Sequence, residues 1–348
     1  MEPPGAVRAR RRTGWRHYLP EILIAAILGG ASVNTLVEFY WLGYTPYLTI
    51  GWDIATLASV SLFFAMRYSD RHPGRFLREL VVLGTIVALV SVFTGLGNGA
   101  TDEGYTTPYY AQMMFDHLNP YTNLAILHYT VTIGPFYSHA VTSTSYDTYL
   151  PLISFVQIPG SGIVGYELLG VAAWLGMVYL VRRDEFAAIT LASPVIALLA
   201  SNGFNDLPLL FLMTLSLRGW TGPKAKAVEY LTYGMKQFAN AFWLVYYIAR
   251  RAWLSTALVV IVSVLWLVPF LLWSPASGIW CNAATLGLAP GCSSLYGAGR
   301  GLADLWDHWN YYVWPVWIYA LFRPTIDRWL RGLGRWLGVV PAAARPAS

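Results

Sequence analysis

Long apolar stretches alternate with short polar segments along most of the chain. Candidate membrane-spanning helices lie at 21–43, 50–67, 79–97, 162–181, 186–201, 206–218, 253–273 and 309–322. A spanning helix needs roughly 20 apolar residues, and shorter helices suffice where neighbouring helices cover them. The pattern therefore predicts a polytopic membrane protein.

One further apolar stretch, 227–249, has basic residues at both of its ends. Positive charge marks the cytoplasmic flanks of membrane helices, so a single span here would place one basic end outside. We therefore interpret this stretch as two short helices with their apex near Gly234, Lys236 and Gln237. The predicted fold is all-α: a polytopic helical membrane bundle of about ten membrane helices, including this short pair, with both termini in the cytoplasm.

Composition and charge predict which side of the membrane each loop faces. Hydrophobic residues make up 56% of the chain and charged residues only 12%, a balance that excludes an ordinary soluble domain. Lys and Arg cluster in alternate loops, whereas the segment 98–150 contains neither, so we place this segment on the outer side. The same rule explains the basic N-terminal segment. Because no recognition motif accompanies it, nucleic acid is not an expected partner.

The predicted domain organisation follows from this pattern. It comprises a basic cytoplasmic tail over 1–20, a transmembrane hairpin over 21–78, a transmembrane module over 79–322 with outer loops 98–150 and 274–308, and a cytoplasmic tail over 323–348. We expect no cleavable signal peptide, because the first apolar stretch is too long for a signal h-region. The expected localisation is an integral, multi-pass position in the cell membrane.

Two cations, Lys236 and Arg300, fall on the predicted outer side, out of 23 Lys and Arg in the chain. Lys236 either snorkels to the interface or binds an anionic ligand, and Arg300 is either solvated or part of the same site. Cys281 and Cys292 share the outer loop with Arg300. They form either a disulfide or two free thiols.

The segment 98–150 also predicts a helix on the outer membrane surface. Thr107 suits a cap and Pro108 the first helical position. An apolar face recurs at helical spacing and lies opposite a polar one; the apolar residues are Tyr110, Met113, Met114 and Leu118, and the polar ones are Gln112, Asp116 and Asn119. Such an amphipathic helix lies in the plane of the interface.

Asp102 and Glu103 stand just before this helix in a chain with few charges. They form either a solvated turn, or a general base or metal-binding pair in which the two carboxylates divide the roles. Spacing alone does not decide between these interpretations. We expect no metal site among the outer histidines, because no two of His117, His128 and His139 are spaced to share one helical face.

Polar residues within the apolar stretches are further candidates. Asn205 and Asp206 precede Pro208 and are most simply a helix cap. Glu167 lies inside a predicted span, where a carboxylate is costly unless it is paired or binds a polar group near a cavity.

Taken in order, these motifs resemble those of a known family. The outer-loop motifs resemble the first large outer loop of GT-C type integral membrane glycosyltransferases; they are Thr101-Asp102-Glu103, the tyrosine-rich helix, Asn119-Pro120-Tyr121, and the residues from Tyr146 to Leu152. The branch that looks closest uses polyprenyl-phosphate sugars and includes mannosyltransferases. Two later motifs are also similar, Lys236-Gln237 at a short helix apex and the turn with Asn202, Asn205, Asp206 and Pro208.

The resemblance covers about 98–273 and departs from the family in two ways. The acidic loop follows the third predicted helix, whereas in the family it usually follows the first, so 1–78 looks like an added hairpin. No soluble C-terminal domain follows the last predicted helix.

The resemblance implies an inverting hexosyltransferase whose site is extracytoplasmic. Asp102 would take a proton from an acceptor hydroxyl, and Glu103 would orient Asp102 or the sugar. Lys236, Arg300 and Gln237 would bind the donor phosphate. The other implied substrate contacts are Tyr109, Asn119, Tyr121, Asn205 and Asp206. A divalent ion, Mg or Mn, is compatible with this chemistry, although nothing in the residues requires it.

The partners implied are a polyprenyl-phosphate-linked sugar donor, membrane lipid, and a glycan, lipid or protein acceptor. Two alternatives belong to other classes. In a lipid-linked saccharide flippase or small-solute transporter, Lys236 binds the moving anion and Asp102 acts as a gate. We see no second copy of the acidic loop or of the lysine hairpin, which disfavours a transporter built from repeats. A non-catalytic subunit of an envelope polysaccharide complex is the third hypothesis.

Overall fold

The structure is a computed structural model. It describes residues 73–94, 103–123, 125–133, 137–145, 150–156, 162–201, 203, 205–273 and 313–336. The predicted spans 21–43 and 50–67 and the outer loop 274–308 lie outside the described residues.

The described elements are mostly helices. In chain order they are α3 (Pro73–Thr94), α4 (Glu103–Phe115), β1 (Ala125–Ile133), β2 (Tyr137–Ser145), α5 (Leu152–Val156), α6 (Gly162–Val181), α7 (Glu185–Leu191), α8 (Pro194–Ala200), α9 (Asp206–Thr214), η2 (Leu215–Gly219), α10 (Gly222–Thr232), α11 (Gln237–Ala249), α12 (Trp253–Trp273) and α14 (Val313–Trp336). The prediction of a helical bundle is confirmed.

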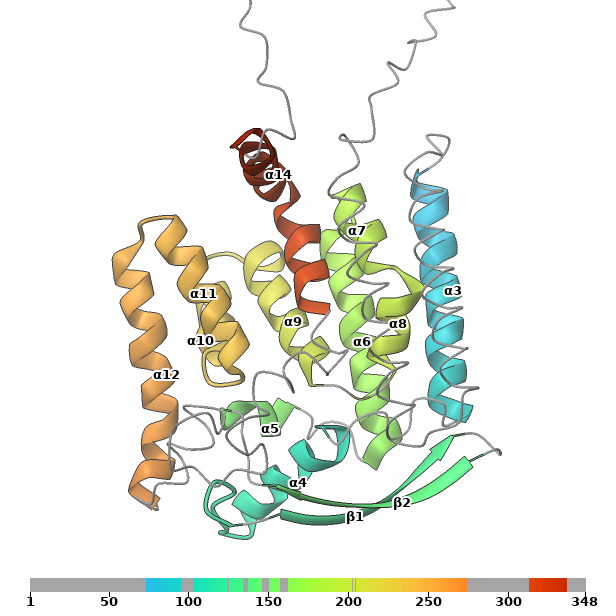
Figure 1. The fold of residues 1–348 in the computed structure, drawn as a ribbon, viewed down its shortest axis with the longest axis vertical. Helices are drawn as coiled ribbons and strands as arrows, with labels where there is room; N and C mark the ends of the chain where they lie inside the picture. Colours follow the sequence, from blue (N-terminus) through green and yellow to red (C-terminus); the bar gives the residue numbers. More distant parts are fainter. Residues whose placement is uncertain are drawn as a thin grey trace, which may run out of the picture.

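The helices stand side by side, and α4, α5 and the two strands form a layer across one end of the bundle (Figure 1). Within the bundle, α3 packs on α6 and α8, α6 packs on α9, α14 packs on α7, and α11 packs on α12. The loop between α6 and α7, which carries Arg182 and Arg183, lies at the opposite end (Figure 1). The charge pattern requires the layer without Lys or Arg and the loop with Arg182 and Arg183 to lie at opposite ends of the bundle, as they do. The assignment of each end to a side of a membrane stays a prediction.

The interpretation of 227–249 as two short helices is confirmed. α10 ends at Thr232 and α11 begins at Gln237, and residues 233–236 form the turn between them. α6 and α12 coincide with the predicted stretches 162–181 and 253–273. Helix length and apolar composition were therefore sufficient to locate these elements.

Two predicted spans are interrupted. The stretch 186–201 divides into α7 and α8, because Pro194 cannot donate a backbone hydrogen bond to continue the first helix. The stretch 206–218 begins as α9 and changes to a π-helical turn at Leu215. Ser201 and Asn205, which lie between α8 and α9, are both fully buried.

The outer helix is present but begins earlier than predicted. α4 starts at Glu103, so that Pro108 lies inside the helix instead of at its first position. The prediction that Thr107 caps the helix is wrong, since its hydroxyl instead accepts a hydrogen bond from the Asn205 amide at 3.2 Å. The side chain of Thr107 is fully buried and contacts Asn205, the residue before α9.

The strands correct the all-α prediction. β1 and β2 form an antiparallel hairpin in which Ala125 pairs with Ser145 and Ile133 pairs with Tyr137. Both strands are rich in Thr and Val, whose β-branched side chains favour strands, and Gly134-Pro135 separates them in the sequence.

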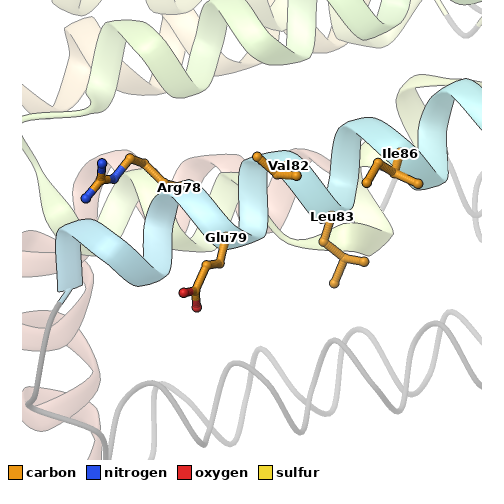
Figure 2. A pocket seen from close by; sticks show the side chains of 5 residues that line it. All are labelled: Arg78, Glu79, Val82, Leu83 and Ile86. Carbon is orange, nitrogen blue, oxygen red and sulfur yellow. The ribbon is translucent and has the colours of Figure 1, made fainter.

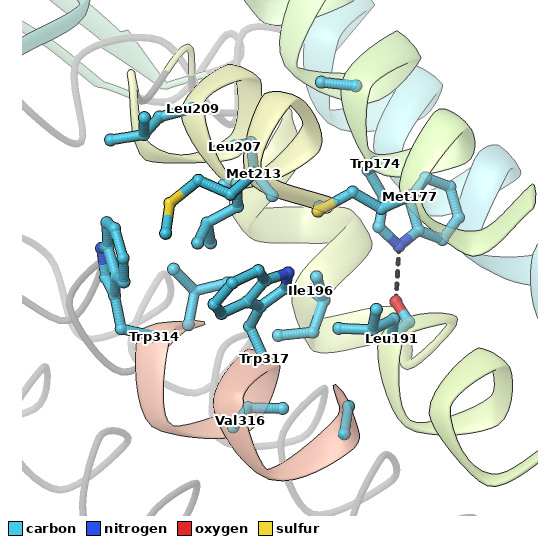
Figure 3. Packing of buried hydrophobic residues seen from close by; sticks show 14 of the residues in the cluster. Trp174, Met177, Leu191, Ile196, Leu207, Leu209, Met213, Trp314, Val316 and Trp317 are labelled. Atoms are coloured by element: carbon cyan, nitrogen blue, oxygen red, sulfur yellow. Dashed lines mark hydrogen bonds between the residues drawn. The ribbon is translucent and has the colours of Figure 1, made fainter. Parts of the chain in front are cut away.

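Three tryptophans are fully buried in the core. The Trp174 indole donates to the Leu191 carbonyl at 2.7 Å, as Figure 3 shows. Trp243 and Trp317 donate to the hydroxyls of Thr232 and Thr214, at 2.9 and 2.8 Å. Each buried N–H therefore has a partner, as burial of an indole requires. The first two bonds join consecutive helices, and the third joins α14 to α9 across 103 residues.

Among the described residues, α12 is the one helix that is long and apolar enough to cross a membrane. Its 21 residues are about 30 Å long, which matches the hydrocarbon thickness of a bilayer. Leu254 is 78% exposed and Leu272 is 80% exposed, near its two ends. An apolar helix with such exposed side chains is favoured next to lipid and disfavoured in water.

The contact between α6 and the end of α8 leaves no room for a side chain at Gly170. A Cβ atom there would lie 2.2 Å from the backbone oxygen of Ala200. A backbone atom cannot rotate away, so the helices would have to separate. Glycine at position 170 therefore allows the end of α8 to approach α6 this closely.

We predict that Gly170→Ala lowers the stability of the folded protein by at least about 1–3 kcal/mol, the usual cost of overpacking. Thermal unfolding of purified protein in detergent measures this. Gly332→Ala is the matched control, because nothing lies within 4 Å of the added Cβ in α14. Equal melting temperatures for the two variants would contradict the close contact of α6 with α8.

Candidate functional site

The side chain of Lys236 is fully buried at the turn between α10 and α11. Its ammonium donates to Asn205 Oδ1 at 3.0 Å and to Asp206 Oδ1 at 2.9 Å. Both members of the Lys236–Asp206 ion pair have side chains that are 0% exposed. The sequence predicted Lys236 at this apex, but it did not predict that Asp206 would neutralise it.

Further hydrogen bonds connect this ion pair to two other helices. The Trp314 indole at the start of α14 donates to Asp206 Oδ1 at 3.0 Å. The Asn205 amide donates to the Thr107 hydroxyl of α4 at 3.2 Å. We call Thr107, Asn205, Asp206, Lys236 and Trp314 the Lys236 cluster. It joins α4, α9, α14 and the α10–α11 turn, four parts of the chain that are far apart in sequence.

Local sequence explains why the chain turns at 201–205. The Ser201 hydroxyl donates to the Leu198 carbonyl at 2.7 Å and closes the end of α8. Gly203 has a φ of 69°, a conformation that glycine adopts without strain. Asp206 then begins α9, so its carboxylate lies at the positive end of the helix dipole. The turn delivers Asn205 and Asp206 to the interior of the bundle.

The opposing turn at 233–236 is held by its neighbours. The Gly234 carbonyl accepts a hydrogen bond from the Leu152 N–H of α5 at 2.8 Å. A Cβ atom on Gly234 would lie 2.6 Å from the ring of Trp266 on α12, so a side chain is excluded there. The Asn240 amide donates to the Tyr233 carbonyl at 3.1 Å. The turn is therefore fixed by α5 below it and by α11 and α12 beside it.

Lys236 and Asp206 balance each other's charge within the cluster. Lys236 supplies a full positive charge. Because α9 and α11 both begin at the cluster, their N-terminal ends add partial positive charge. Asp206 offsets one of these charges. A buried ion pair remains stable only while both partners are present, since removal of either one leaves an uncompensated charge. The ion pair is therefore nearly neutral as a whole, and its stability depends on both of its members.

Glu167 of α6 is another fully buried carboxylate near this turn. Its Cγ lies 3.7 Å from the position that a Cβ on Gly203 would take. The predicted location of Glu167, inside a span and close to a polar region, therefore agrees with the structure.

The structure brings together Lys236, Asn205 and Asp206 among the predicted site residues. Gln237 is the first residue of α11, directly after Lys236, and is half-buried. The simple helix-cap interpretation of Asn205 is not supported, since its side chain makes no capping hydrogen bond to α9. Its amide is used instead to bridge Lys236 and Thr107.

Asn119 and Tyr121 lie in a different place from the Lys236 cluster. The Asn119 carboxamide accepts from the Tyr121 N–H at 3.0 Å and donates to the Phe270 carbonyl of α12 at 3.4 Å. The ring of Tyr121 is fully buried and packs edge-on against Phe270 at 5.4 Å. Asn119 was predicted on the polar, solvent-facing side of the outer helix, and this prediction is wrong. Tyr109 on α4 is 38% exposed.

Several predicted residues cannot be placed. Asp102, Arg300, Cys281 and Cys292 lie outside the described residues, and Glu103 is described only as the first residue of α4. Among the outer histidines, His117 follows the end of α4 in a left-handed conformation, while His128 and His139 belong to the two strands. In the described part of the chain, no group of three or more His, Cys, Asp or Glu residues is placed to hold a metal ion.

A second polar cluster joins α10 to α11, and the sequence analysis did not predict it. Glu229 is buried and accepts hydrogen bonds from the Tyr233 hydroxyl, from the Tyr247 hydroxyl at 2.5 Å and from Lys226 at 3.0 Å. Lys226 also donates to the Tyr247 hydroxyl at 2.6 Å. The spacing of Lys226, Glu229 and Tyr233 places them on one helical face, which is a signal that the sequence contained.

Among the described residues, two cavities have linings that do not include Lys236. One, of about 550 Å³, is lined by Arg78, Glu79, Val82, Leu83 and Ile86, which all project from α3 (Figure 2). The other, of about 600 Å³, lies between α11 and α14 and includes Trp314 in its lining. The second therefore ends next to the Lys236 cluster.

Comparison with known proteins adds no family assignment: no protein-family model, no curated protein and no solved structure matches the chain.

We predict that Lys236→Met destabilises the protein by about 3–5 kcal/mol, because Asp206 is then buried without its counter-ion. The double variant Lys236→Met with Asp206→Asn should lose much less than the sum of the two single variants. Denaturant unfolding in mixed micelles measures this double-mutant cycle.

Lys224→Met is the control for this cycle, since Lys224 is exposed in the first turns of α10. Additive losses, with no coupling between the two positions, would show that the Lys236–Asp206 pair is not formed.

The Glu229 cluster predicts a difference between two neighbouring tyrosines. Tyr247→Phe should cost about 1–3 kcal/mol, because it removes a donor to a buried carboxylate. Tyr246→Phe is the matched control, because this ring packs against Phe242 and Phe322 and no hydrogen bond is formed by its hydroxyl among the described contacts. The same unfolding assay compares them, and equal losses would refute the assignment.

Proposed function

We propose that the chain is a membrane glycosyltransferase that moves a hexose from a polyprenyl-phosphate donor to a glycan, lipid or protein acceptor on the extracytoplasmic side. Asp102 is the general base in this proposal, and Lys236 is the cation that faces the donor phosphate. The sugar passes in one displacement, so its anomeric configuration inverts.

The observation that supports this proposal most strongly is the hydrogen-bonded path from Lys236 through Asn205 to Thr107. Thr107 lies one helical turn after Glu103, about 6 Å along the axis of α4. Asp102 directly precedes Glu103 in the chain. The first residue of α4 and the lysine, more than a hundred residues apart in sequence, are therefore linked through the side chains of Asn205 and Thr107 and one turn of helix.

The reaction assigns a defined task to each group. The Asp102 carboxylate accepts the proton of the acceptor hydroxyl while the hydroxyl oxygen forms a bond to the anomeric carbon. The bond between that carbon and the phosphate oxygen breaks, and the electron pair remains on the polyprenyl phosphate. Positioned bases of this kind contribute about 10²- to 10⁴-fold to the rate.

The leaving phosphate develops negative charge that a prearranged cation stabilises. In the proposal, the phosphate approaches Lys236 between the N-terminal ends of α9 and α11 and competes with Asp206 for the ammonium. Gln237, the first residue of α11, and Arg300 are the further proposed phosphate ligands. The Lys236–Asp206 pair keeps the ammonium buried and charged until the donor phosphate arrives.

The proposed sugar contacts divide into two groups. Tyr109 is exposed on α4 and is suited to stack on a sugar ring, while Asn205 and Asp206 belong to the Lys236 cluster. Asn119 and Tyr121 are buried against α12, so we assign them to holding the outer loop on the bundle instead of contacting the sugar.

A second candidate function, transport of an anionic solute or lipid-linked saccharide, is favoured by one observation. The α8–α9 and α10–α11 pairs are interrupted helices whose N-terminal ends meet at a buried charged residue, which is an arrangement that transporters use to bind anions. Uptake into vesicles with no covalent product would establish this function and exclude transfer.

We predict that Asp102→Asn lowers hexose transfer from a polyprenyl-phosphate hexose by about 10²- to 10⁴-fold, because the base is lost. Purified protein in liposomes and a labelled donor measure the rate. Asp116→Asn is the matched control: this aspartate follows α4, is exposed, and bonds to Gln112 at 3.1 Å.

Unchanged melting temperatures for both variants show that the loss is chemical. Full activity of Asp102→Asn would remove this residue from the role of base, and the absence of any transfer by the unmodified protein with every tested donor would refute the proposed function.

A further inference from the structure

The cavity between α11 and α14 is an apolar groove with one charged end. Its lining is aromatic and aliphatic except for Arg250 and Thr325. Aromatic side chains bridge the two helices along it: the ring centroids of Phe238 and Trp314 are 6.1 Å apart, and those of Tyr246 and Phe322 are 5.9 Å apart. These side chains hold the helices apart and leave a volume of about 600 Å³ open between them.

The length of the groove matches one leaflet of a bilayer. From Phe238 to Arg250 the α11 side of the groove extends about 18 Å, at 1.5 Å per residue. Half of the hydrocarbon core of a membrane is about 15 Å. A lipid chain whose polar group lies at Arg250 would therefore end beside Phe238 and Trp314. A polyprenyl chain of many isoprene units would be too long for this space.

The groove is open to the surroundings of the bundle. Val245 lines it midway along α11 and is 69% exposed. Ala241 and Ala249 lie one turn before and one turn after Val245 on α11, and their small side chains do not narrow the groove. A lipid chain can enter from the side without passing through the Lys236 cluster.

Charge at the far end selects the head group. The guanidinium of Arg250 lies 4.1 Å from the centre of the Tyr246 ring and is exposed at the end of α11. On α14, Arg323 pairs with Asp327 at 3.3 Å, while the exposed Arg328 and Arg331 add further positive charge to this helix. Arg250 lines the groove itself, and guanidinium groups bind phosphate oxygens with two parallel hydrogen bonds.

We propose that the α11–α14 groove binds one chain of an anionic membrane phospholipid, with the lipid phosphate at Arg250. This site shares only Trp314 with the Lys236 cluster and does not depend on the proposed transferase activity. The bound chain packs against Trp314, which also bonds to Asp206, so the lipid supports the start of α14 next to the cluster.

The test measures binding of phosphatidylglycerol and phosphatidylcholine with the same acyl chains to the purified full chain, by native mass spectrometry. Phosphatidylglycerol should bind more tightly. Arg250→Gln should weaken its binding by about fivefold, the usual effect of one cation near a lipid phosphate. Arg251→Gln is the matched control, because this neighbour does not line the groove.

A second variant tests the chain instead of the head group. Ala241→Trp fills the groove and should abolish binding of both lipids, while Ala257→Trp on the exposed face of α12 should leave binding unchanged. Equal binding of the two lipids with no effect of Arg250→Gln would overturn the proposal. Unchanged binding in Ala241→Trp would also overturn it, as would preferential binding of a polyprenyl phosphate.

Discussion

A buried ammonium is costly in the interior of a helical bundle unless a carboxylate lies beside it, and the structure around Lys236 follows from this constraint. Asp206 can reach Lys236 only because the chain turns at 201–205, and Lys236 can reach Asp206 only because α10 and α11 form a short pair. The two interrupted helix pairs therefore depend on each other. If either one were a continuous helix, its charged residue would be buried alone.

The same pairing connects the bundle to the outer layer. The side chain of Asn205 accepts a hydrogen bond from Lys236 through its oxygen and donates one to Thr107 through its amide nitrogen. A shift of α4 would change the position of Asn205 and with it the surroundings of the ammonium. In the proposed function, this coupling places the acceptor side of the site, on α4, in a fixed position relative to the donor side, which productive geometry requires.

Part of this arrangement could be predicted from the sequence. Charge at both ends of 227–249 was sufficient to predict the α10–α11 pair with Lys236 at its turn, and length and apolar composition located α6 and α12. The hydrogen bond between Thr107 and Asn205 was not predictable, because nothing local to Thr107 indicates a partner 98 residues away. The hairpin at 125–145 left a signal in its β-branched residues and the Glu229 cluster left one in its helical spacing, but neither pattern was interpreted from the sequence.

The claim on which this account depends is that α4 meets the α8–α9 turn beside Lys236. Cysteine cross-linking in native membranes tests it most directly, with Thr107→Cys and Asn205→Cys in a chain whose Cys281 and Cys292 are replaced by serine. Because the two native side chains are in hydrogen-bond contact at 3.2 Å, we expect rapid oxidative cross-linking. Tyr109→Cys with Asn205→Cys, in which the first position is exposed, should react slowly. Cross-linking through Tyr109 but not through Thr107 would contradict the account.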